Sequence, residues 1–324
     1  MTERYERIAV EEAYITPEIA KLQAAQMPVR FASNAQANVI SSMLDLGEGR
    51  IKQMDADGIA MQVCLLGSIA LQDIDPVEAN ELCALANDCL AEAAQRFPGR
   101  LAGLAGFAPL DPERAARELE RSVKTKGLKG GVINSHSRGE YLDDRKFWPI
   151  FEVLQAMDVP LYIHPRDPAP QMAKPLDVPG FKVGWSWAVE TGTHVIRLIG
   201  NGVFDQFPRL RIVIGHMGEG LPFYLDRIDN RYYWEHEMAG TAPRLKRKPS
   251  DYVRENVVVT TSGMNYAPPL LMTIQMLGID NVLFAADYPF ENVRESVAAI
   301  DGLNMADSDK RKIYSLNARR VFKL

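Results

Sequence analysis

The sequence has few cysteines, no surplus of basic residues and no long apolar run. Its three cysteines, Cys64, Cys83 and Cys89, are an odd number, and we expect buried free thiols rather than a disulfide framework. The net charge of −5 argues against a nucleic-acid partner, which would require a basic face. No stretch reaches the roughly 18 consecutive apolar residues of a membrane span. The start of the chain is charged and does not resemble a secretory signal, so we expect a cytoplasmic protein with no membrane partner.

The sequence also lacks a G-x-G-x-x-G motif between a predicted strand and a predicted helix, so a dinucleotide-binding sheet has no support. Instead, short apolar runs typical of strands buried on both faces alternate with segments of helical periodicity. The predicted strands cover residues 8–13, 61–66, 101–108, 131–135, 161–164, 211–216, 257–262 and 282–287. Eight strand-helix repeats favour an α/β fold of the (β/α)8 TIM-barrel type over an open doubly wound sheet, and we expect residues 1–324 to form a single domain.

Two stretches interrupt this repeat. Residues 21–38 follow the first strand and precede a helix expected around residues 39–54, and the proline-rich residues 167–184 follow the fifth strand. Insertions after barrel strands project from the face that carries the site, so we expect both to be loops that cover it as lids. Further helices are expected over residues 76–97, 147–156, 187–199, 221–234, 270–277 and 293–300, with another beginning at an Asp111 N-cap.

Several predicted strands end in ionisable residues, which are unfavourable in a hydrophobic core. Glu11 and Glu12 end the first strand, His164 the fifth, His216 the sixth and Asp287 the eighth. The carboxyl ends of barrel strands meet at one face, and the first and last strands are neighbours, so these side chains are expected to converge. Carboxylates and imidazoles gathered in one place are typical metal ligands, and the sequence therefore predicts a metal site at this face.

The other three of the five histidines differ in position. His136 stands just after the fourth predicted strand, at the same face as the predicted metal site. His194 and His236 lie inside predicted helices, where we expect surface or packing residues rather than ligands. A lone histidine at a strand end is more often a structural residue, so it is the grouping with carboxylates that favours ligation.

Longer stretches of the sequence carry a more specific resemblance. The segments IAVEEAYITPE, YIHPRDP, IGHMGEGLP, TTSG, FAADYPFE and NARRVFKL follow one another along the chain. They resemble the metal-dependent decarboxylases of the amidohydrolase superfamily, in particular the dihydroxybenzoate, gamma-resorcylate and carboxyvanillate decarboxylases. The resemblance covers nearly the whole chain in the same order, which makes it stronger than any single motif.

The resemblance implies a ligand set and a pair of residues that handle protons. Glu11, His164 and Asp287 would hold one divalent metal ion per subunit, which would be Mn2+, Zn2+ or Mg2+. His216 would lie near the substrate, with Glu219 behind it.

The resemblance also implies residues that bind a small aromatic acid substrate. Arg227 matches a position from which relatives reach into a neighbouring subunit's active site, so a homodimer or homotetramer is expected. Phe290 matches an aromatic residue that packs on the substrate ring. Asn134 and His136 resemble the corresponding strand end of the carboxyvanillate enzyme, where substrate binding and loop stabilisation are equally open roles.

Two positions depart from the family pattern. Many superfamily members carry a histidine two places after the first-strand ligand, whereas this chain has Ala13, which argues against a binuclear hydrolase site. Carboxyvanillate-type enzymes carry an arginine before the helix that ends in LDLG, to hold a second acidic substituent. The counterpart here is Ala35, with Arg30 as the nearest candidate, so a carboxyvanillate substrate is in doubt.

The expected reaction is the loss of CO2 from an ortho-hydroxylated aromatic acid. Direct loss would leave an aryl carbanion, so the carboxyl-bearing ring carbon must be protonated first. Asp287 is the candidate acid, with His216 and Glu219 supplying and orienting the proton. An ortho hydroxyl and a carboxylate oxygen could together chelate the metal. Two alternatives stay open: a mononuclear hydrolase or hydratase in which Asp287 acts as a base, and a catalytically silent metal-binding barrel.

Overall fold

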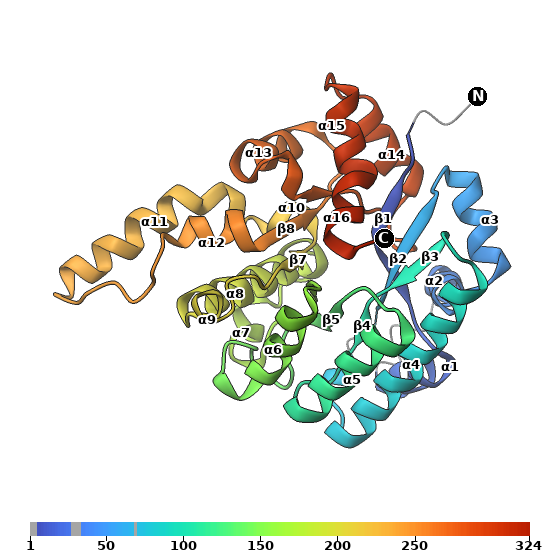
Figure 1. Ribbon diagram of the computed structural model, residues 1–324, viewed down its shortest axis with the longest axis horizontal. Helices are drawn as coiled ribbons and strands as arrows, with labels where there is room; N and C mark the ends of the chain where they lie inside the picture. Colours follow the sequence, from blue (N-terminus) through green and yellow to red (C-terminus); the bar gives the residue numbers. More distant parts are fainter. Residues whose placement is uncertain (1–4, 27–33, 68–69) are drawn as a thin grey trace.

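Parallel strands form the centre of the molecule, and helices surround them (Figure 1). The structure is a computed structural model that describes residues 5–26, 34–67 and 70–324. The strands are β1 (Ile8–Tyr14), β2 (Met61–Leu66), β3 (Leu101–Gly103), β4 (Ala105–Gly106), β5 (Gly131–Asn134), β6 (Leu161–His164), β7 (Ile212–Ile214), β8 (Val257–Thr260) and β9 (Val282–Leu283). They pair in chain order, β1-β2-β3 in one sheet and β4 to β9 in a second. The predicted positions and the parallel order of the strands are therefore confirmed.

Backbone hydrogen bonds connect the two sheets at both of their edges. The predicted third strand is divided at Leu104, whose N–H donates to the carbonyl of Cys64 at 2.9 Å. At the opposite edge, the Val10 N–H donates to the Phe284 carbonyl at 3.2 Å, which joins the first strand to the segment after the last. The strands thus follow one another around a ring, as expected for an α/β barrel. Individual backbone hydrogen bonds, rather than continuous ladders, link the two sheets.

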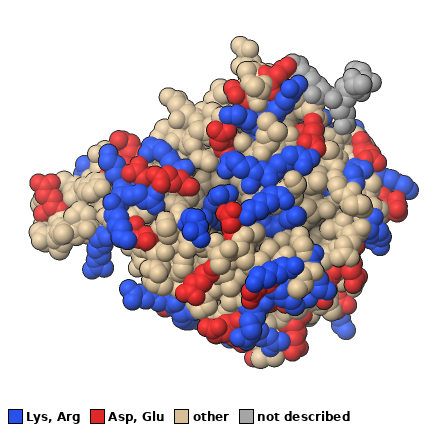
Figure 2. Space-filling model, viewed as in Figure 1, with Lys and Arg blue, Asp and Glu red and all other residues tan. Residues whose placement is uncertain are grey.

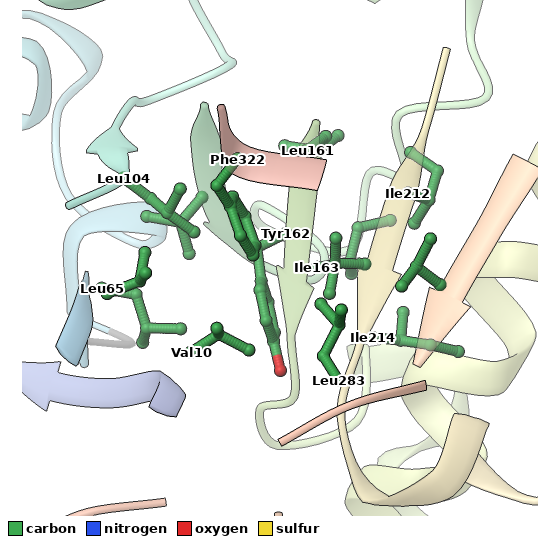
Figure 3. Packing of buried hydrophobic residues seen from close by; sticks show 14 of the residues in the cluster. Val10, Leu65, Leu104, Leu161, Tyr162, Ile163, Ile212, Ile214, Leu283 and Phe322 are labelled. Atoms are coloured by element: carbon green, nitrogen blue, oxygen red, sulfur yellow. The ribbon is translucent and has the colours of Figure 1, made fainter. Parts of the chain in front are cut away.

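Apolar side chains from strands on all sides pack together in the centre (Figure 3). Val10, Leu65, Ile163 and Ile214 are almost fully buried, as near-continuous apolar strands between barrel interior and helices should be. The free thiols Cys64 and Cys83 belong to the same core, as the sequence predicted, whereas Cys89 is a free thiol that is only partly buried.

The helices begin mostly at recognisable N-terminal signals. Asp111 accepts a hydrogen bond from the Arg114 N–H and so caps α5, as predicted, and Asp75 caps α4 in the same way. The helices are α1 (Pro17–Gln26), α2 (Asn34–Leu44), α3 (Glu48–Asp57), α4 (Pro76–Arg96), α5 (Pro112–Lys126), α6 (Trp148–Met157), α7 (Pro170–Leu176), α8 (Trp187–Gly200), α9 (Val203–Gln206), α10 (His216–Glu219), α11 (Leu221–Met238), α12 (Pro249–Asn256), α13 (Ala267–Leu277), α14 (Val293–Asp301), α15 (Asp307–Arg311) and α16 (Asn317–Phe322). None of those in the described part of the chain is long and apolar enough to cross a membrane.

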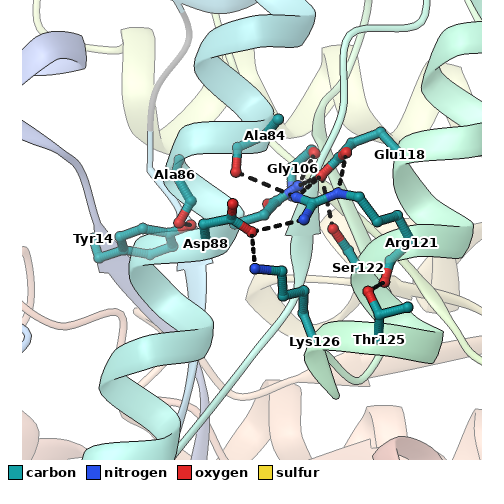
Figure 4. Close-up of polar contacts among 11 residues, drawn as sticks. Tyr14, Ala84, Ala86, Asp88, Gly106, Glu118, Arg121, Ser122, Thr125 and Lys126 are labelled. Carbon is teal, nitrogen blue, oxygen red and sulfur yellow. Dashed lines mark hydrogen bonds and ion pairs between the residues drawn. The ribbon is translucent and has the colours of Figure 1, made fainter.

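Neighbouring helices are also joined by polar contacts. Arg121 of α5 donates to Asp88 of α4 at 2.8 Å and to Glu118 of its own helix at 2.8 Å (Figure 4). Tyr14, at the end of β1, donates its hydroxyl to the Ala86 carbonyl of α4 at 3.1 Å. On the face drawn in Figure 2, acidic and basic side chains are interspersed, which matches the modest net charge.

Both predicted lid loops contain helices within the described residues, so the expectation of unstructured insertions is wrong there. The first contains α1 and α2, while residues 27–33, including Arg30, lie outside the described residues. The expected single helix over residues 39–54 is instead α2 and α3, which are separate helices. The second insertion contains α7 and a π-helical turn over Lys182–Ser186. Alanine and glutamine favour a helix without giving an apolar stripe, so a reading based on periodicity misses α1.

Candidate metal and active site

The three predicted metal ligands meet at the carboxyl end of the strands. Glu11 comes from β1, His164 ends β6, and Asp287 follows β9. Each offers a ligand atom, and these atoms all lie within 4.8 Å of one another. His164 Nε2 is 3.9 Å from Glu11 Oε1, a separation that a single cation between the two atoms can span. The three side chains are therefore close enough together to hold one cation.

The hydrogen bond of His164 leaves the correct nitrogen available for a metal. Its Nδ1 lies 2.9 Å from the carbonyl oxygen of Pro165, which can only accept a hydrogen bond. Nδ1 must then carry the proton, so Nε2 presents its lone pair toward Glu11. Backbone carbonyls fix metal-binding histidines in this way in many proteins.

Glu11 is fully buried, and its two carboxylate oxygens have different surroundings. Oε2 accepts hydrogen bonds from the hydroxyls of Thr260, at 2.7 Å, and Ser262. Oε1 is buried and has no hydrogen-bond partner among the described residues. An isolated buried carboxylate oxygen is costly, and a cation would satisfy it. The donor set of two carboxylates and one imidazole suits a divalent ion such as Mn2+, Mg2+ or Zn2+.

Glycine at position 215 allows the chain to pass close to this carboxylate. A Cβ at Gly215 would lie 2.8 Å from Glu11 Oε1 and 3.1 Å from Oε2, closer than atoms normally approach. The carboxylate cannot easily move away, because the Thr260 and Ser262 hydroxyls hold it.

We therefore expect Gly215→Ala to weaken Mn2+ binding by roughly 10- to 100-fold, the usual cost of disturbing the support of a ligand. Calorimetric titration would measure this affinity, with a Glu11→Ala/His164→Ala double variant giving the baseline without binding. Gly200→Ala is the matched control, because nothing lies within 4 Å of the Cβ added there. Equal Mn2+ affinity in the two glycine variants would contradict the close approach.

His216 lies beside the three candidate ligands. His216 Nδ1 is 2.8 Å from Glu219 Oε1, and its Nε2 is 3.8 Å from Asp287 Oδ2. Burial lowers the pKa of His216, but the carboxylates of Glu219, Glu11 and Asp287 outweigh it and raise this pKa well above the usual value. The imidazole thus lies between an orienting carboxylate and the predicted acid, and both carboxylates favour its protonated form.

The backbone around His216 has an unusual shape. The short helix α10 is interrupted, with positive φ at His216, Met217, Gly218 and Glu219, and Gly220 ends it in the same region. Non-glycine residues avoid this region, so the packing around the turn must hold it in place. The sequence HMGEG gives no helix or strand pattern, and only the two glycines signal such a turn.

A cavity of about 430 Å3 opens over the ligands. His164, His216 and Asp287 line it, together with Phe290, which is 52% exposed and for which the resemblance implies a contact with the substrate ring. The remaining wall comes from the helical insertions and neighbouring segments, with Gln23, Ala35, Gln36, Val39, Ile40, Met43, Gly67, Pro165, Val183, Trp187 and Glu291. Sequence reasoning placed the two insertions at this face and singled out Ala35 as the counterpart of a substrate-holding arginine, but it did not identify the other wall residues.

Asn134 and His136 are not among the described residues that line the cavity. The Gly139 N–H donates to His136 Nδ1 at 3.1 Å, and His136 Nε2 lies 3.0 Å from the carbonyl of Asp167 and therefore donates to it. Burial lowers the pKa of His136, which keeps the ring neutral. Asn134 is buried and donates to the Leu66 carbonyl at 3.4 Å. These contacts fit the loop-stabilising role that the sequence left open.

His194 is a fully buried packing residue of α8 rather than a surface residue. Its Nε2 accepts the Leu142 N–H at 3.1 Å, so its Nδ1 donates to Ser135 Oγ at 3.1 Å. Burial lowers the pKa of His194 to about 3. The unfolded chain therefore binds a proton near pH 6.5 that the folded chain excludes, and stability is lost as the pH falls from 6.5 toward 3.

We expect this residue to contribute a loss of up to about 1.4 kcal/mol of unfolding free energy per pH unit below 6.5. Glutamine cannot take up the proton, so His194→Gln should be less stable at pH 7 yet lose less stability between pH 6.5 and 5. Urea unfolding of both proteins at several pH values would measure the difference. Parallel curves would show that His194 does not contribute to the acid sensitivity.

Comparisons with known proteins agree with this geometry. The sequence profile of the amidohydrolase family matches residues 45–324. A gamma-resorcylate decarboxylase of Polaromonas sp. is 39% identical over 98% of each chain. The manganese-bound structure of 5-carboxyvanillate decarboxylase from Novosphingobium aromaticivorans has a TM-score of 0.94 at 38% identity, covering 100% of this chain and 98% of that one. The 2,6-dihydroxybenzoate decarboxylase from Rhizobium has a TM-score of 0.89 at 36% identity, covering 98% and 99% of the two chains.

Proposed function

The chain belongs to the amidohydrolase family, and on that premise we propose that it is a metal-dependent decarboxylase of an ortho-hydroxylated aromatic acid. One observation carries the proposal. The ligand atoms of Glu11, His164 and Asp287 lie within 4.8 Å of one another beside a cavity of about 430 Å3, and His216 Nε2 lies 3.8 Å from Asp287 Oδ2. The relatives named above act on acids of this class, which supports the same chemistry here.

We propose that one divalent cation per subunit is held by Glu11, His164 and Asp287. The unpartnered Glu11 Oε1 and the free Nε2 of His164 support this assignment, and relatives have been crystallised with manganese. When bound, the cation supplies Lewis-acid stabilisation of negative charge on substrate oxygens.

The protein's own groups handle the proton. Asp287 would deliver a proton to the carboxyl-bearing ring carbon, forming a C–H bond and a dearomatised ring. The bond to the carboxyl carbon then breaks, CO2 leaves, and the electron pair of that bond restores aromaticity. His216 would return a proton to Asp287, while Glu219 keeps the imidazole oriented and charged. Phe290 and Trp187 would contact the ring and exclude water from the cavity.

A substrate panel tests the function. We expect CO2 release and loss of ultraviolet absorbance with 2-hydroxybenzoates, and negligible turnover of matched 4-hydroxybenzoates that lack the ortho hydroxyl. Metal analysis of the same sample would identify the cation. Hydrolysis of a lactone, or hydration of an unsaturated acid, without CO2 release from any aromatic acid would instead favour the hydrolase or hydratase alternative.

We also propose a homodimer or homotetramer in which α11 contacts a second copy. This helix projects from the body of the molecule (Figure 1), and Phe223 and Met238 on it are 70% and 67% exposed. Apolar surface of this kind commonly marks an interface. Arg227 lies exposed on the same helix and is not among the described residues that line its own chain's cavity.

Mixing two inactive variants would test whether Arg227 completes a neighbour's site. Arg227→Ala and Asp287→Asn subunits, each inactive alone, should regain activity when unfolded and refolded together. For dimers we expect about a quarter of the wild-type activity, because about half of random dimers are mixed and each holds one intact site. A mixture that stays inactive, or a fully active monomer, would contradict the shared site.

We further propose that residues 1–324 form one domain and that the protein is cytoplasmic. The single hydrophobic core that runs from β1 to α16 supports one domain. The three free thiols support a reducing compartment.

A further inference from the structure

A second glutamate follows the proposed metal ligand on β1 and has a separate set of contacts. Glu12 is fully buried and is not among the described residues that line the cavity. Its Oε1 accepts the Ala286 N–H at 3.0 Å, and its Oε2 accepts the Tyr288 N–H at 3.2 Å. These two amides belong to the residues directly before and after Asp287. One carboxylate therefore holds the backbone on both sides of the proposed acid.

The backbone at Asp287 needs this support. Its φ of 64° lies in the left-handed region, which aspartate enters at a conformational cost. The sheet ladder does not extend to it, because β9 ends at Leu283. The Ala13 N–H also donates to the Tyr288 carbonyl at 2.8 Å, but the two bonds to Glu12 are the ones that hold the amides on both sides of Asp287. Their loss should let the residue relax and shift its carboxylate relative to Glu11 and His164.

The position of Glu12 is in turn set by a series of buried side-chain hydrogen bonds. The amide Nε2 of Gln62 donates to Glu12 Oε2 at 3.4 Å, and Arg50 Nη1 donates to Gln62 Oε1 at 3.1 Å. A guanidinium can only donate, so it fixes the Gln62 amide with its oxygen toward Arg50 and its NH2 group toward Glu12. Arg50 is 1% exposed, and its guanidinium also lies over the Tyr288 ring at 5.0 Å.

The same guanidinium reaches the cavity wall. Arg50 Nη2 donates to the Ser42 carbonyl at 3.1 Å and to the Ala13 carbonyl at 2.7 Å. Ser42 lies in the last turn of α2, next to Met43, which lines the cavity. Arg50 is therefore connected both to the substrate-facing helix and, through Gln62 and Glu12, to Asp287.

We propose that Glu12, Gln62 and Arg50 form a buried positioning device that fixes the Asp287 carboxylate, with Arg50 also fixing the α2 wall of the cavity. The inference rests on the proposed decarboxylase function. Glu12 and Gln62 act only through Asp287, so their loss should slow the proton-transfer step. Arg50 acts on both the Asp287 carboxylate and the α2 wall of the cavity, so its loss should also weaken substrate binding.

Three variants test the device with Mn2+ as the metal and an accepted 2-hydroxybenzoate as the substrate. In Glu12→Gln one carboxylate oxygen becomes an NH2 group, which opposes one of the two backbone N–H groups. We expect kcat per bound Mn2+ to fall by roughly 10- to 100-fold with KM nearly unchanged. Gln62→Met should show the same pattern with a smaller effect. Arg50→Met should lower kcat and also raise KM.

Further readouts separate positioning from a loss of folded protein. Slower proton delivery should increase the solvent deuterium isotope effect on kcat, whereas a smaller folded fraction leaves this effect unchanged. The electron paramagnetic resonance spectrum of bound Mn2+ should also change in Glu12→Gln. Glu118→Gln is the matched control, because Glu118 holds Asn87 and Arg121 between α4 and α5, away from the cavity. It should alter neither the isotope effect nor the spectrum.

Unchanged kcat, isotope effect and Mn2+ spectrum in Glu12→Gln would overturn the proposal, as would equal KM values in Gln62→Met and Arg50→Met. If Glu12→Gln does not fold, Gln62→Met decides the matter, because it leaves the glutamate in place. Failure of the decarboxylase function can be distinguished from failure of the positioning proposal. In the first case the wild-type protein would release no CO2, while the Mn2+ spectra would still report on Asp287.

Discussion

Replacement of Asp287 with asparagine is expected to reduce decarboxylation by at least about 10⁴-fold, the upper end for a general acid. Asparagine keeps the size of the side chain but has no proton to deliver to the ring carbon. The change also removes one negative charge from a group whose ligand atoms lie within 4.8 Å of one another. Metal content must be measured alongside the rate, so that loss of the acid is distinguished from loss of the cation.

The fate of the proton provides an independent check on the same residue. In D2O, the wild-type enzyme should place one deuterium at the ring carbon that carried the carboxyl group, which mass spectrometry of the product would detect. Product without solvent deuterium would rule out protonation before CO2 loss. Substantial activity in metal-loaded Asp287→Asn would show that another group is the acid.

His216→Asn is expected to lower kcat by roughly 10²- to 10⁴-fold while Mn2+ binding stays largely intact. The imidazole Nε2 lies 3.8 Å from Asp287 Oδ2, and asparagine cannot hold or return a proton. Glu219→Gln should reduce the rate in the same direction but less, because it removes only the partner 2.8 Å from Nδ1. Steady-state rates normalised to bound Mn2+ would measure both effects. Loss of Mn2+ from His216→Asn would instead identify His216 as a further ligand.

The fold and the convergence of polar strand-end residues were predictable because they depend on patterns that are local in sequence. Runs such as VVVT at β8 signal buried parallel strands, and a barrel brings their carboxyl ends together whatever the loops do. Glu11, His164 and Asp287 therefore converge without any knowledge of side-chain contacts. The comparisons with solved structures confirm the predicted barrel family.

The rest depends on contacts that the sequence does not display. Glu11 and Glu12 are adjacent and chemically alike, and a register shift between Ala9 and Glu12 against β2 accompanies their different contacts. His136 stands at a strand end like His164, yet both of its nitrogens are occupied by loop backbone. The helices of the cavity wall and most of its lining residues were not identified, because those segments carry no apolar periodicity strong enough to predict a helix.

The cavity wall formed by α1 and α2 has a consequence for how substrate preference could diverge in this family. The wall leaves β1 and returns beside it, since the Ile15 N–H donates to the Met43 carbonyl at 3.2 Å, so its two ends are neighbours in space. Segments whose ends meet can be exchanged with little disturbance to the remainder of a fold. One part of the cavity wall thus lies on a segment between residues 16 and 45, while the candidate metal ligands lie outside that segment. A chimera that carries a relative's segment could acquire that relative's substrate preference while retaining its own chemistry. Arg50 would still have to donate its hydrogen bond to the carbonyl at position 42.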